Sequence, residues 1–183
     1  MKDKGIRMIV FVRVVLAVLA ALAAAAQDRY TLKVPNGLAF SEFRGYEDWK
    51  VVAPSQTDAQ NVMRVILANP VMMKAYREGA PGNGKPFPNG SKIAKIEWQP
   101  KKLTDAPFSA STPDTVPGPL TAVEFIEKDA KRFPDTNGWG YAEFKYDAAS
   151  ATFTPDGNDA KCGAACHKLA AAKDYIFTAY PQR

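Results

Sequence analysis

The sequence contains a single histidine, His167, and only two cysteines, Cys162 and Cys166. One histidine excludes any site that needs two, and one cysteine pair allows at most one disulfide. A strong charge of one sign is also absent, because the formal net charge of the 183 residues is +5. No basic run with interleaved aromatic residues occurs, so the sequence lacks the electrostatic pattern of a nucleic-acid-binding protein. Any specialised chemistry must therefore depend on very few cysteine and histidine side chains.

Long hydrophobic runs are scarce as well. The run from Val14 to Ala26 has 13 residues, short of the roughly 20 that a membrane-spanning helix needs. A basic start precedes it, and Ala24 and Ala26 form a small-x-small cleavage site. We predict a cleaved secretory signal peptide at residues 1–26, with an uncleaved membrane anchor as the alternative. Cleavage would remove four basic residues and one acidic residue, leaving one exported, periplasmic domain at residues 27–183 with a net charge of +2.

Export would place the two thiols in an oxidising compartment, where they do not stay idle. In the stretch KCGAACHK, His167 directly follows the second cysteine. This order is typical of c-type haem attachment, in which two thiols add to the haem vinyl groups and the histidine binds the iron. The usual signature has two residues between the cysteines, whereas Gly163–Ala165 makes three, and this insert is small enough to bulge. From the stretch alone, haem, a structural disulfide, a redox pair and zinc all remain open.

A haem ligated by His167 would have no second histidine for its other axial position. The chain after the predicted signal peptide has three methionines, Met63, Met72 and Met73. The last two lie in a predicted helix, where core packing is their more common role. We therefore expect a five-coordinate iron with one open site, which favours ligand binding or catalysis over simple electron transfer.

The pattern of apolar residues and turn signals predicts an α+β fold: an antiparallel sheet of four to five strands with two to three helices. The C-terminal helix would carry the haem attachment motif. The segment 121–130 also has acceptable helical spacing, Asn69 and Pro70 suit the start of a helix, and the proline-rich residues 99–119 predict a long irregular loop. Strands are expected at residues 50–53, 60–68, 90–98, 121–130 and 138–147, and a helix at residues 69–79.

Three charged residues lie among apolar neighbours in predicted strands. They are Arg64 in VMRVIL, Lys95 in IAKIEW and Glu124 in AVEFI. Such side chains usually point to water from the surface of a sheet. Because buried charges are normally paired, three of them on neighbouring strands are also consistent with one polar pocket. Over an open iron, that pocket would suit proton transfer and the stabilisation of anions.

Five ordered segments of the chain resemble the cytochrome P-460 family, which includes the cytochrome c′-beta proteins. The resemblance covers nearly the whole chain after residue 26. It implies an exported, mostly β, c-type haem protein that is commonly a homodimer. Relatives of cytochrome P-460 oxidise hydroxylamine at a five-coordinate haem, whereas the c′-beta proteins bind nitric oxide beside a distal aromatic cap. The segments are GYEDWKVVAP, MRVILANP, NGSKIAKIE, VEFIEKDAKRFPDTNGWGYAEF and CGAACHKLAAAKDYIFTAY.

The resemblance assigns roles to the cysteine and histidine side chains. Cys162 and Cys166 match the thioether cysteines, and His167 matches the proximal iron ligand. The familiar members have two residues between the cysteines, so the three-residue spacing departs from the family pattern. This departure leaves open whether one or both thioether bonds form.

The resemblance also gives the three strand charges a place in the haem pocket. Lys95 occupies the position of a lysine that is covalently joined to the porphyrin edge in the catalytic branch, while Lys92 lies on the opposite strand face. Arg64 falls at a distal-pocket arginine. Glu124 falls at or next to a pocket carboxylate that relays protons. Lys95 therefore favours the catalytic branch.

The leading hypothesis is an exported oxidoreductase with covalent haem c that oxidises hydroxylamine or a related small nitrogen species. A non-catalytic nitric oxide-binding protein of the c′-beta type is the alternative, and a disulfide-stabilised domain without haem is a third. The expected partners are a small nitrogen-containing ligand or substrate, a periplasmic electron-transfer cytochrome and a second copy of the chain. Neither nucleic acid nor, after signal cleavage, a membrane is expected.

Overall fold

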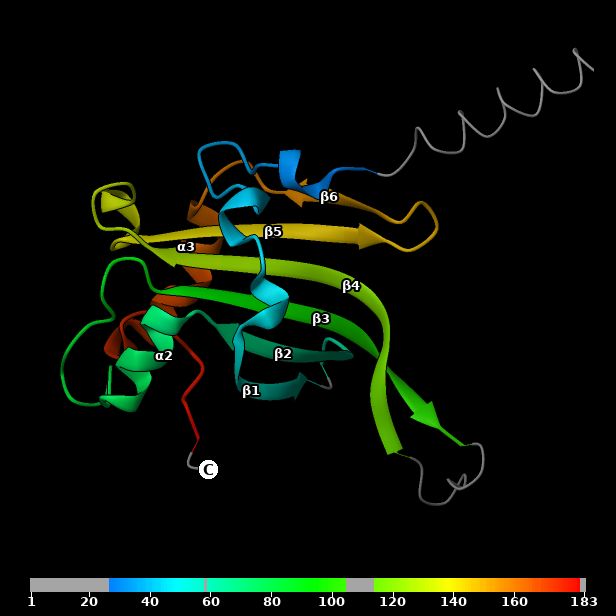
Figure 1. The fold of residues 1–183 in the computed structure, drawn as a ribbon, viewed down its shortest axis with the longest axis horizontal. Helices are drawn as coiled ribbons and strands as arrows, with labels where there is room; N and C mark the ends of the chain where they lie inside the picture. Colours follow the sequence, from blue (N-terminus) through cyan, green and yellow to red (C-terminus); the bar gives the residue numbers. More distant parts are fainter. Residues whose placement is uncertain (1–26, 58, 105–113, 182–183) are drawn as a thin grey trace, which may run out of the picture.

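The computed structural model describes residues 27–57, 59–104 and 114–181. Its centre is one antiparallel sheet in which each strand pairs with the next one along the chain (Figure 1). Antiparallel neighbours need no crossover connection, so the sheet is a simple meander. The strands are β1 (Lys50–Thr57), β2 (Val62–Ala68), β3 (Lys92–Leu103), β4 (Asp114–Lys128), β5 (Trp139–Asp147) and β6 (Thr152–Asp156).

Two α-helices and several short 3-10 helices accompany the described strands. The predicted helix after Asn69 is present, and the Asn69 side chain accepts a hydrogen bond from the Met72 amide at 3.0 Å. The predicted C-terminal helix is present and carries the cysteine–histidine motif. The helices are α2 (Pro70–Arg77), α3 (Lys161–His167), η1 (Arg29–Thr31), η2 (Phe40–Phe43), η3 (Tyr46–Asp48), η4 (Pro134–Thr136) and η5 (Lys168–Lys173).

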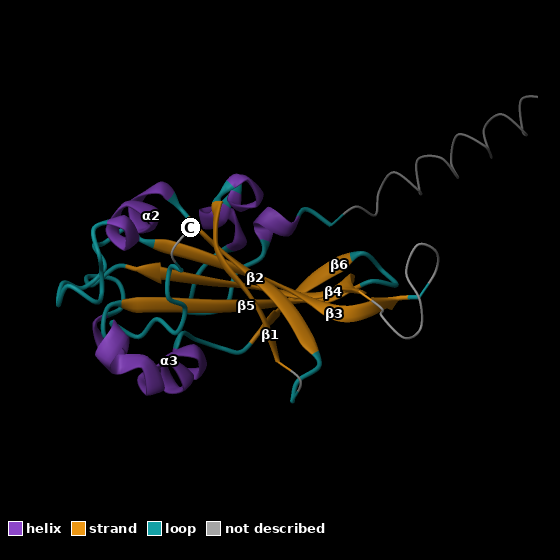
Figure 2. Ribbon diagram, turned by 90° about the horizontal axis from the view of Figure 1, so that it is seen from below, coloured by secondary structure: helices purple, strands orange, loops and turns teal. Residues whose placement is uncertain are grey.

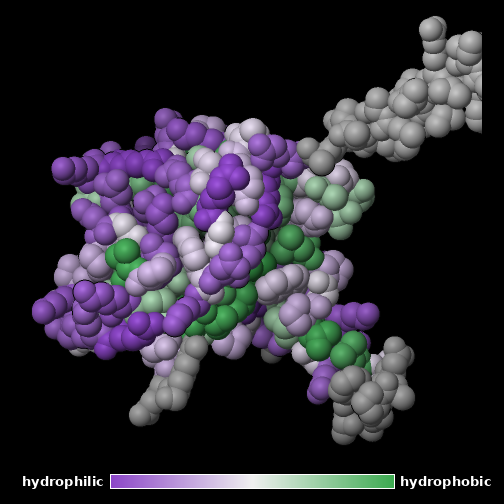
Figure 3. All heavy atoms as spheres, viewed as in Figure 1, coloured by the Kyte–Doolittle hydropathy of each residue, from purple (hydrophilic) through white to green (hydrophobic). Residues whose placement is uncertain are grey.

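The N-terminal segment crosses one face of the sheet and builds an aromatic core there (Figure 1). Phe40 and Phe43 of η2 are fully buried. Their ring centroids lie 5.0 Å and 4.1 Å from that of Phe125 on β4, and such pairs add about 0.5–1.5 kcal/mol beyond the area that they bury. Seen from this side, hydrophilic side chains surround a band of hydrophobic ones in the middle of the surface (Figure 3). The rings themselves are enclosed between the segment and the sheet.

The α+β class is confirmed, with six strands in the described residues in place of four to five. The additional strand is β6, which pairs with the second half of β5. Its sequence, TFTPD, is too short and too turn-like to reveal a strand. Pro155 is tolerated because β6 lies at the edge of the sheet, where one side needs no hydrogen-bonding partner. The segment with two interpretations, 121–130, is a strand as far as Lys128.

The predicted irregular loop at residues 99–119 is wrong in part. β3 continues to Leu103 and β4 begins at Asp114, so the two strands extend beyond the rest of the sheet as a pair. Pro100 faces Pro117 in this extension. Because β2 and β5 do not reach this far, prolines are tolerated on the unpaired outer sides. Proline content alone therefore does not separate a loop from a strand pair here.

Two predictions fall on parts of the chain that the structure leaves out. The signal peptide at residues 1–26 and residues 105–113 of the predicted loop lie outside the described residues. Among the helices that are described, none is long and apolar enough to cross a membrane.

Alternation along β3 and β4 separates the aromatic core from the opposite face of the sheet. Ala94 and Phe125 are fully buried in the core. Their neighbours Lys95 and Glu124 point the other way, because successive side chains of a strand lie on opposite faces. Figure 2 shows α3 on the side of the strands away from α2. The face that carries Lys95 and Glu124 is thus the face that α3 partly covers.

Candidate functional site

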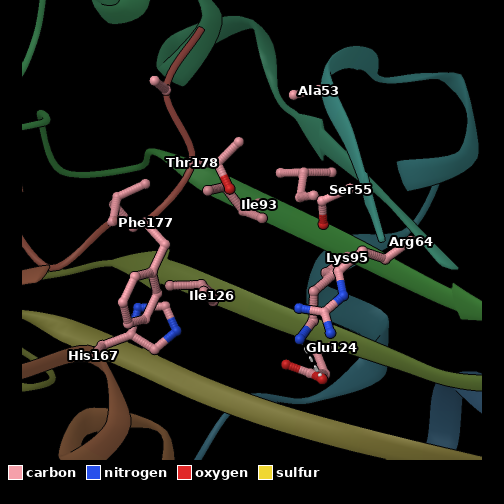
Figure 4. A pocket seen from close by; sticks show the side chains of 13 residues that line it. Ala53, Ser55, Arg64, Ile93, Lys95, Glu124, Ile126, His167, Phe177 and Thr178 are labelled. Carbon is pink, nitrogen blue, oxygen red and sulfur yellow. Dashed lines mark ion pairs between the residues drawn. The ribbon is translucent and has the colours of Figure 1, made fainter. Parts of the chain in front are cut away.

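A cavity of about 360 Å³ opens on the face of the sheet opposite the aromatic core. Its volume is within the range of roughly 300–1,000 Å³ typical of small-molecule and cofactor sites. Strands β1 to β4 supply most of its floor, and residues 176–179 supply another wall. Figure 4 shows His167 at one end, beside Phe177, and Lys95 and Glu124 at the other. The cavity therefore has an imidazole end and a charged end.

Ion pairs between neighbouring strands form the charged end. Lys95 lies directly opposite Glu124 in the β3–β4 register, and its Nζ is 2.6 Å from Glu124 Oε1. The same Nζ is 3.0 Å from Glu97 Oε1. Directly opposed residues have their Cβ atoms about 5 Å apart, which explains why these charges meet. The side chains of Lys95 and Glu124 are 23% and 25% exposed, so the pair is open to the cavity.

Arg64 extends this cluster from β2 and has an unused donor. It lies opposite Glu97 in the β2–β3 register, and its Nε is 3.5 Å from Glu97 Oε1. Its Nη2 donates to Gln60 Oε1 at 2.8 Å. The Nε atom is buried and makes no hydrogen bond within the described chain. The guanidinium group as a whole lines the cavity, and such a group binds anions through several N–H donors. The structure thus brings together all three strand charges singled out in the sequence.

Burial raises the pKa of the Glu124 carboxyl above its ordinary value, although the positive charge of Lys95 acts in the opposite direction. Glu143 on β5 lies directly opposite Glu124. Its pKa is also raised, mainly by burial and next by the negative charge of Glu124. A carboxyl with a raised pKa is a better proton acceptor near neutral pH. The charged end of the cavity therefore has groups for both anion binding and proton transfer.

His167 ends α3 and is held in one tautomer. Its Nδ1 lies 2.5 Å from the backbone carbonyl oxygen of Tyr175. Because a carbonyl can only accept, Nδ1 carries the proton and Nε2 keeps a free lone pair, the form that binds a metal. The ring centroid lies 4.9 Å from that of Tyr141 and 5.0 Å from that of Phe177. Burial lowers the pKa of His167, although the Tyr175 carbonyl acts the other way, and a lowered pKa favours the neutral imidazole.

Cys162 and Cys166 lie one turn apart in α3, and both are exposed and free. Residues four apart are neighbours on one helix face. The three-residue spacing thus presents both thiols on the same side of the helix, and the expected bulge is not needed because Gly163–Ala165 is wound into α3. A Cβ at Gly163 would lie 2.5 Å from the Tyr141 ring. Glycine at this position is therefore what lets α3 lie flat against β5.

These residues fit a c-type haem. Two thiols share a helix face, a neutral imidazole nitrogen is available at the adjoining cavity, and Ile93, Ile126 and Ile176 give that cavity apolar walls. Across the described residues, no group of three or more histidine, cysteine, aspartate or glutamate side chains is arranged to hold a bare metal ion.

Comparison with protein families supports the haem interpretation. The Cytochrome P460 family model matches residues 43–178. This chain belongs to the cytochrome P460 family. Membership of this family implies haem binding, so the protein is a haem protein. A search of curated proteins gives no match.

In this member of the family, four residues at the site were not singled out from the sequence. Glu97 follows Lys95 by two positions, so strand alternation already places both on one face. Glu143 becomes visible only through the β4–β5 register. Tyr141 contributes a packing ring and Tyr175 a backbone carbonyl, and no sequence pattern marks either role.

Proposed function

We propose that this cytochrome P460 is an exported oxidoreductase that oxidises hydroxylamine or a related small nitrogen species. The observation that carries the proposal is the cluster of Arg64, Lys95 and Glu124 in the same cavity as His167. A cofactor pocket that only stored a neutral ligand would not need these partly buried charges, which are costly unless they are paired or used.

The haem would be held by α3 and its surroundings. Cys162 and Cys166 would form thioether bonds, His167 Nε2 would bind the iron, and Lys95 would join the porphyrin edge. When bound, the haem supplies a redox-active iron with a coordination position for a small nitrogen compound. Met72 and Met73 support an open position, because both are buried in the core.

The side chains at the charged end would handle protons and anions. The Glu124 carboxylate would accept protons released by the bound nitrogen compound, which a raised pKa favours. Arg64 would hold anionic species through its guanidinium group. Lys95 lies between these two groups, since its Nζ is near both Glu124 and Glu97. Removing any one of them leaves the others with an unbalanced charge.

The cellular setting forms part of the same proposal. The signal peptide predicted from the sequence at residues 1–26 supports export to the periplasm, where c-type haem proteins exchange electrons. An electron-transfer cytochrome would then take the electrons that substrate oxidation releases. The family resemblance supports a homodimer.

The charged end also distinguishes the proposal from nitric oxide binding of the c′-beta type, which uses a distal aromatic cap. Phe177 is the one phenyl ring among the described cavity residues, and it contacts His167. It therefore lies at the imidazole end. Charged side chains, not a ring, form the other end.

The test uses protein produced with the c-type assembly machinery. Reduction of an added electron acceptor is followed after hydroxylamine is supplied, and the optical spectrum is recorded. The proposal expects turnover and a strongly red-shifted ferrous Soret band, both lost in Lys95→Ala. Haem-loaded protein that binds nitric oxide without turnover, and whose spectrum Lys95→Ala leaves unchanged, would establish the alternative. A protein without a haem band would overturn both.

A further inference from the structure

The carbonyl that holds His167 belongs to an unusual turn. Asp174 has a φ of 49° and Tyr175 a φ of 64°. Residues other than glycine, asparagine and aspartate rarely adopt this left-handed conformation, and for a bulky residue such as tyrosine it is a clear outlier. Two such residues in succession persist only where the surroundings hold them. The Tyr175 carbonyl therefore reaches His167 Nδ1 because something fixes this turn.

The Asp174 carboxylate supplies that restraint. Its Oδ2 accepts a hydrogen bond from the Phe87 amide at 2.8 Å. Its Oδ1 accepts one from Lys128 Nζ at 2.8 Å and a longer one from Trp139 Nε1 at 3.4 Å. These partners come from the loop before β3, the end of β4 and the start of β5. One side chain thus ties the turn to three separate parts of the fold.

Lys128 is buried beside Asp174. Its side chain is 11% exposed and that of Asp174 is 12% exposed. The Lys128 Nζ also donates to the Asn137 carbonyl at 3.2 Å and lies 4.8 Å from the centroid of the Trp139 ring. A buried ion pair contributes little net stability compared with apolar residues of similar size. Neither residue lines the cavity, so the proposed function leaves the pair without a role.

We propose that the Lys128–Asp174 pair positions the axial ligand of the haem. It fixes the turn that aims the Tyr175 carbonyl at His167 Nδ1, and through this hydrogen bond it sets the orientation and basicity of the imidazole toward iron. Both are positioning residues, since they act through Tyr175 and His167. The inference rests on His167 as the iron ligand, which belongs to the proposed function, but it does not depend on the substrate.

The test compares Asp174→Asn and Lys128→Met holoproteins with a matched control. Lys92 is also a strand lysine in an ion pair, 3.3 Å from Glu127, and lies 4.9 Å from the Phe43 ring. It is on the opposite face from His167, so Lys92→Met removes a similar pair without reaching the turn. Lys128→Arg restores the charge and should restore the property. The readouts are the iron–histidine stretching frequency of the ferrous protein by resonance Raman and the midpoint reduction potential.

We expect Asp174→Asn and Lys128→Met to lower the iron–histidine frequency and raise the reduction potential, because a weaker hydrogen bond makes the imidazole a poorer donor. Lys92→Met should change neither, and Lys128→Arg should return both toward the wild-type values. An unchanged frequency in folded Lys128→Met would overturn the inference, and so would an equal shift in Lys92→Met. If the shifts appear in a protein that does not oxidise hydroxylamine, the substrate proposal fails and this inference stands. A protein without haem would overturn both.

Discussion

Strands β3 and β4 carry two lysine–glutamate pairs of the same kind on opposite faces. Lys92 lies opposite Glu127 and Lys95 lies opposite Glu124. The Lys92 pair is closed by protein, since its Nζ also donates to the Glu42 carbonyl at 2.9 Å. The Lys95 pair opens on the cavity with His167. A lysine–glutamate pair by itself therefore does not indicate a functional site. The Lys95 pair is a candidate because it lines a cavity that a ligand can enter.

A further charged residue, Arg132, lies beside the closed Lys92–Glu127 pair. Arg132 forms an ion pair with Glu42 and lies 3.9 Å from Glu127. Burial raises the pKa of Glu127, just as it raises that of Glu124. The two carboxyls thus share a similar environment and differ in access to a ligand. Equivalent substitutions on the two faces should separate stability from activity.

The largest expected difference is between Glu124→Gln and Glu127→Gln. Loss of the proton acceptor in Glu124→Gln should lower hydroxylamine oxidation per haem by about 100- to 10,000-fold, the usual contribution of a general base. Glu127→Gln should leave this rate within about twofold, as expected for a residue on the face away from the cavity. Steady-state kinetics normalised to haem content measure both. Equal losses of this rate in the two variants would contradict the proposal that only the cavity face takes part in the reaction.

Arg64→Met and Arg132→Met make the second comparison. A hydrogen bond to a charged group contributes about 1.5–3 kcal/mol, so loss of Arg64 should weaken the binding of an anion such as azide or nitrite by roughly 10- to 100-fold. Arg132→Met should lower the midpoint of thermal unfolding without changing anion affinity. Optical titration of the ferric protein gives the affinities. An Arg64→Met protein that binds anions as tightly as wild type would remove Arg64 from the site.

The oxidation rate and the free energy of unfolding should depend on pH in opposite ways. Because the pKa of Glu124 is raised, the rate should increase with pH through a value above the ordinary glutamate pKa of about 4.3. Lys95→Met should raise the pKa of Glu124 further, since the lysine charge lowers that pKa. The free energy of unfolding should have the opposite trend. A raised pKa in the folded state means that stability falls as pH rises from the ordinary to the raised value.

Both faces contribute to that stability trend, since the pKa of Glu127 is raised as well. Only Glu124 should control the rate, so Glu124→Gln should abolish the acid limb and Glu127→Gln should keep it. The control is the haem spectrum over the same pH range, which must stay constant. A limb that survives Glu124→Gln assigns the proton acceptor to another group.

The smallest effect should come from Gly163→Ala. The added methyl would meet the Tyr141 ring and should destabilise the protein by about 1–3 kcal/mol, the usual cost of overpacking. Ala165→Gly is the matched control, because Ala165 is exposed in the same helix and the exchange costs about 1 kcal/mol. Chemical denaturation measures both. A larger loss in Ala165→Gly would show that helix propensity, and not the contact with Tyr141, limits this position.

Local rules predicted much of this molecule. Asn69 and Pro70 marked the start of α2 because capping depends on adjacent residues, and alternation placed Lys95 and Lys92 on opposite faces of β3. The order Cys166–His167 marked the haem motif. In each case the signal lies within a few residues of the chain.

The rest depends on contacts between distant residues. The β4–β5 register alone brings Glu143 to Glu124, and the closing turn alone brings the Tyr175 carbonyl to His167. The strand β6 is stabilised by pairing with β5, which its own five residues do not reveal. The prolines of the β3–β4 extension indicated a loop from the sequence. They are tolerated in strands here because no further strand pairs with the outer sides of the extension, and this depends on the arrangement of the whole sheet.

Peptide mapping of the mature protein by mass spectrometry tests the central claim most directly, that the cavity face holds a covalent haem between α3 and β3. The account predicts haem on the peptide with Cys162 and Cys166, with a further bond to Lys95 and none to Lys92. Fragmentation distinguishes the two lysines. Cysteine peptides without haem, as free thiols or as a disulfide, would contradict the account, and haem joined to Lys92 would contradict its assignment of the two faces.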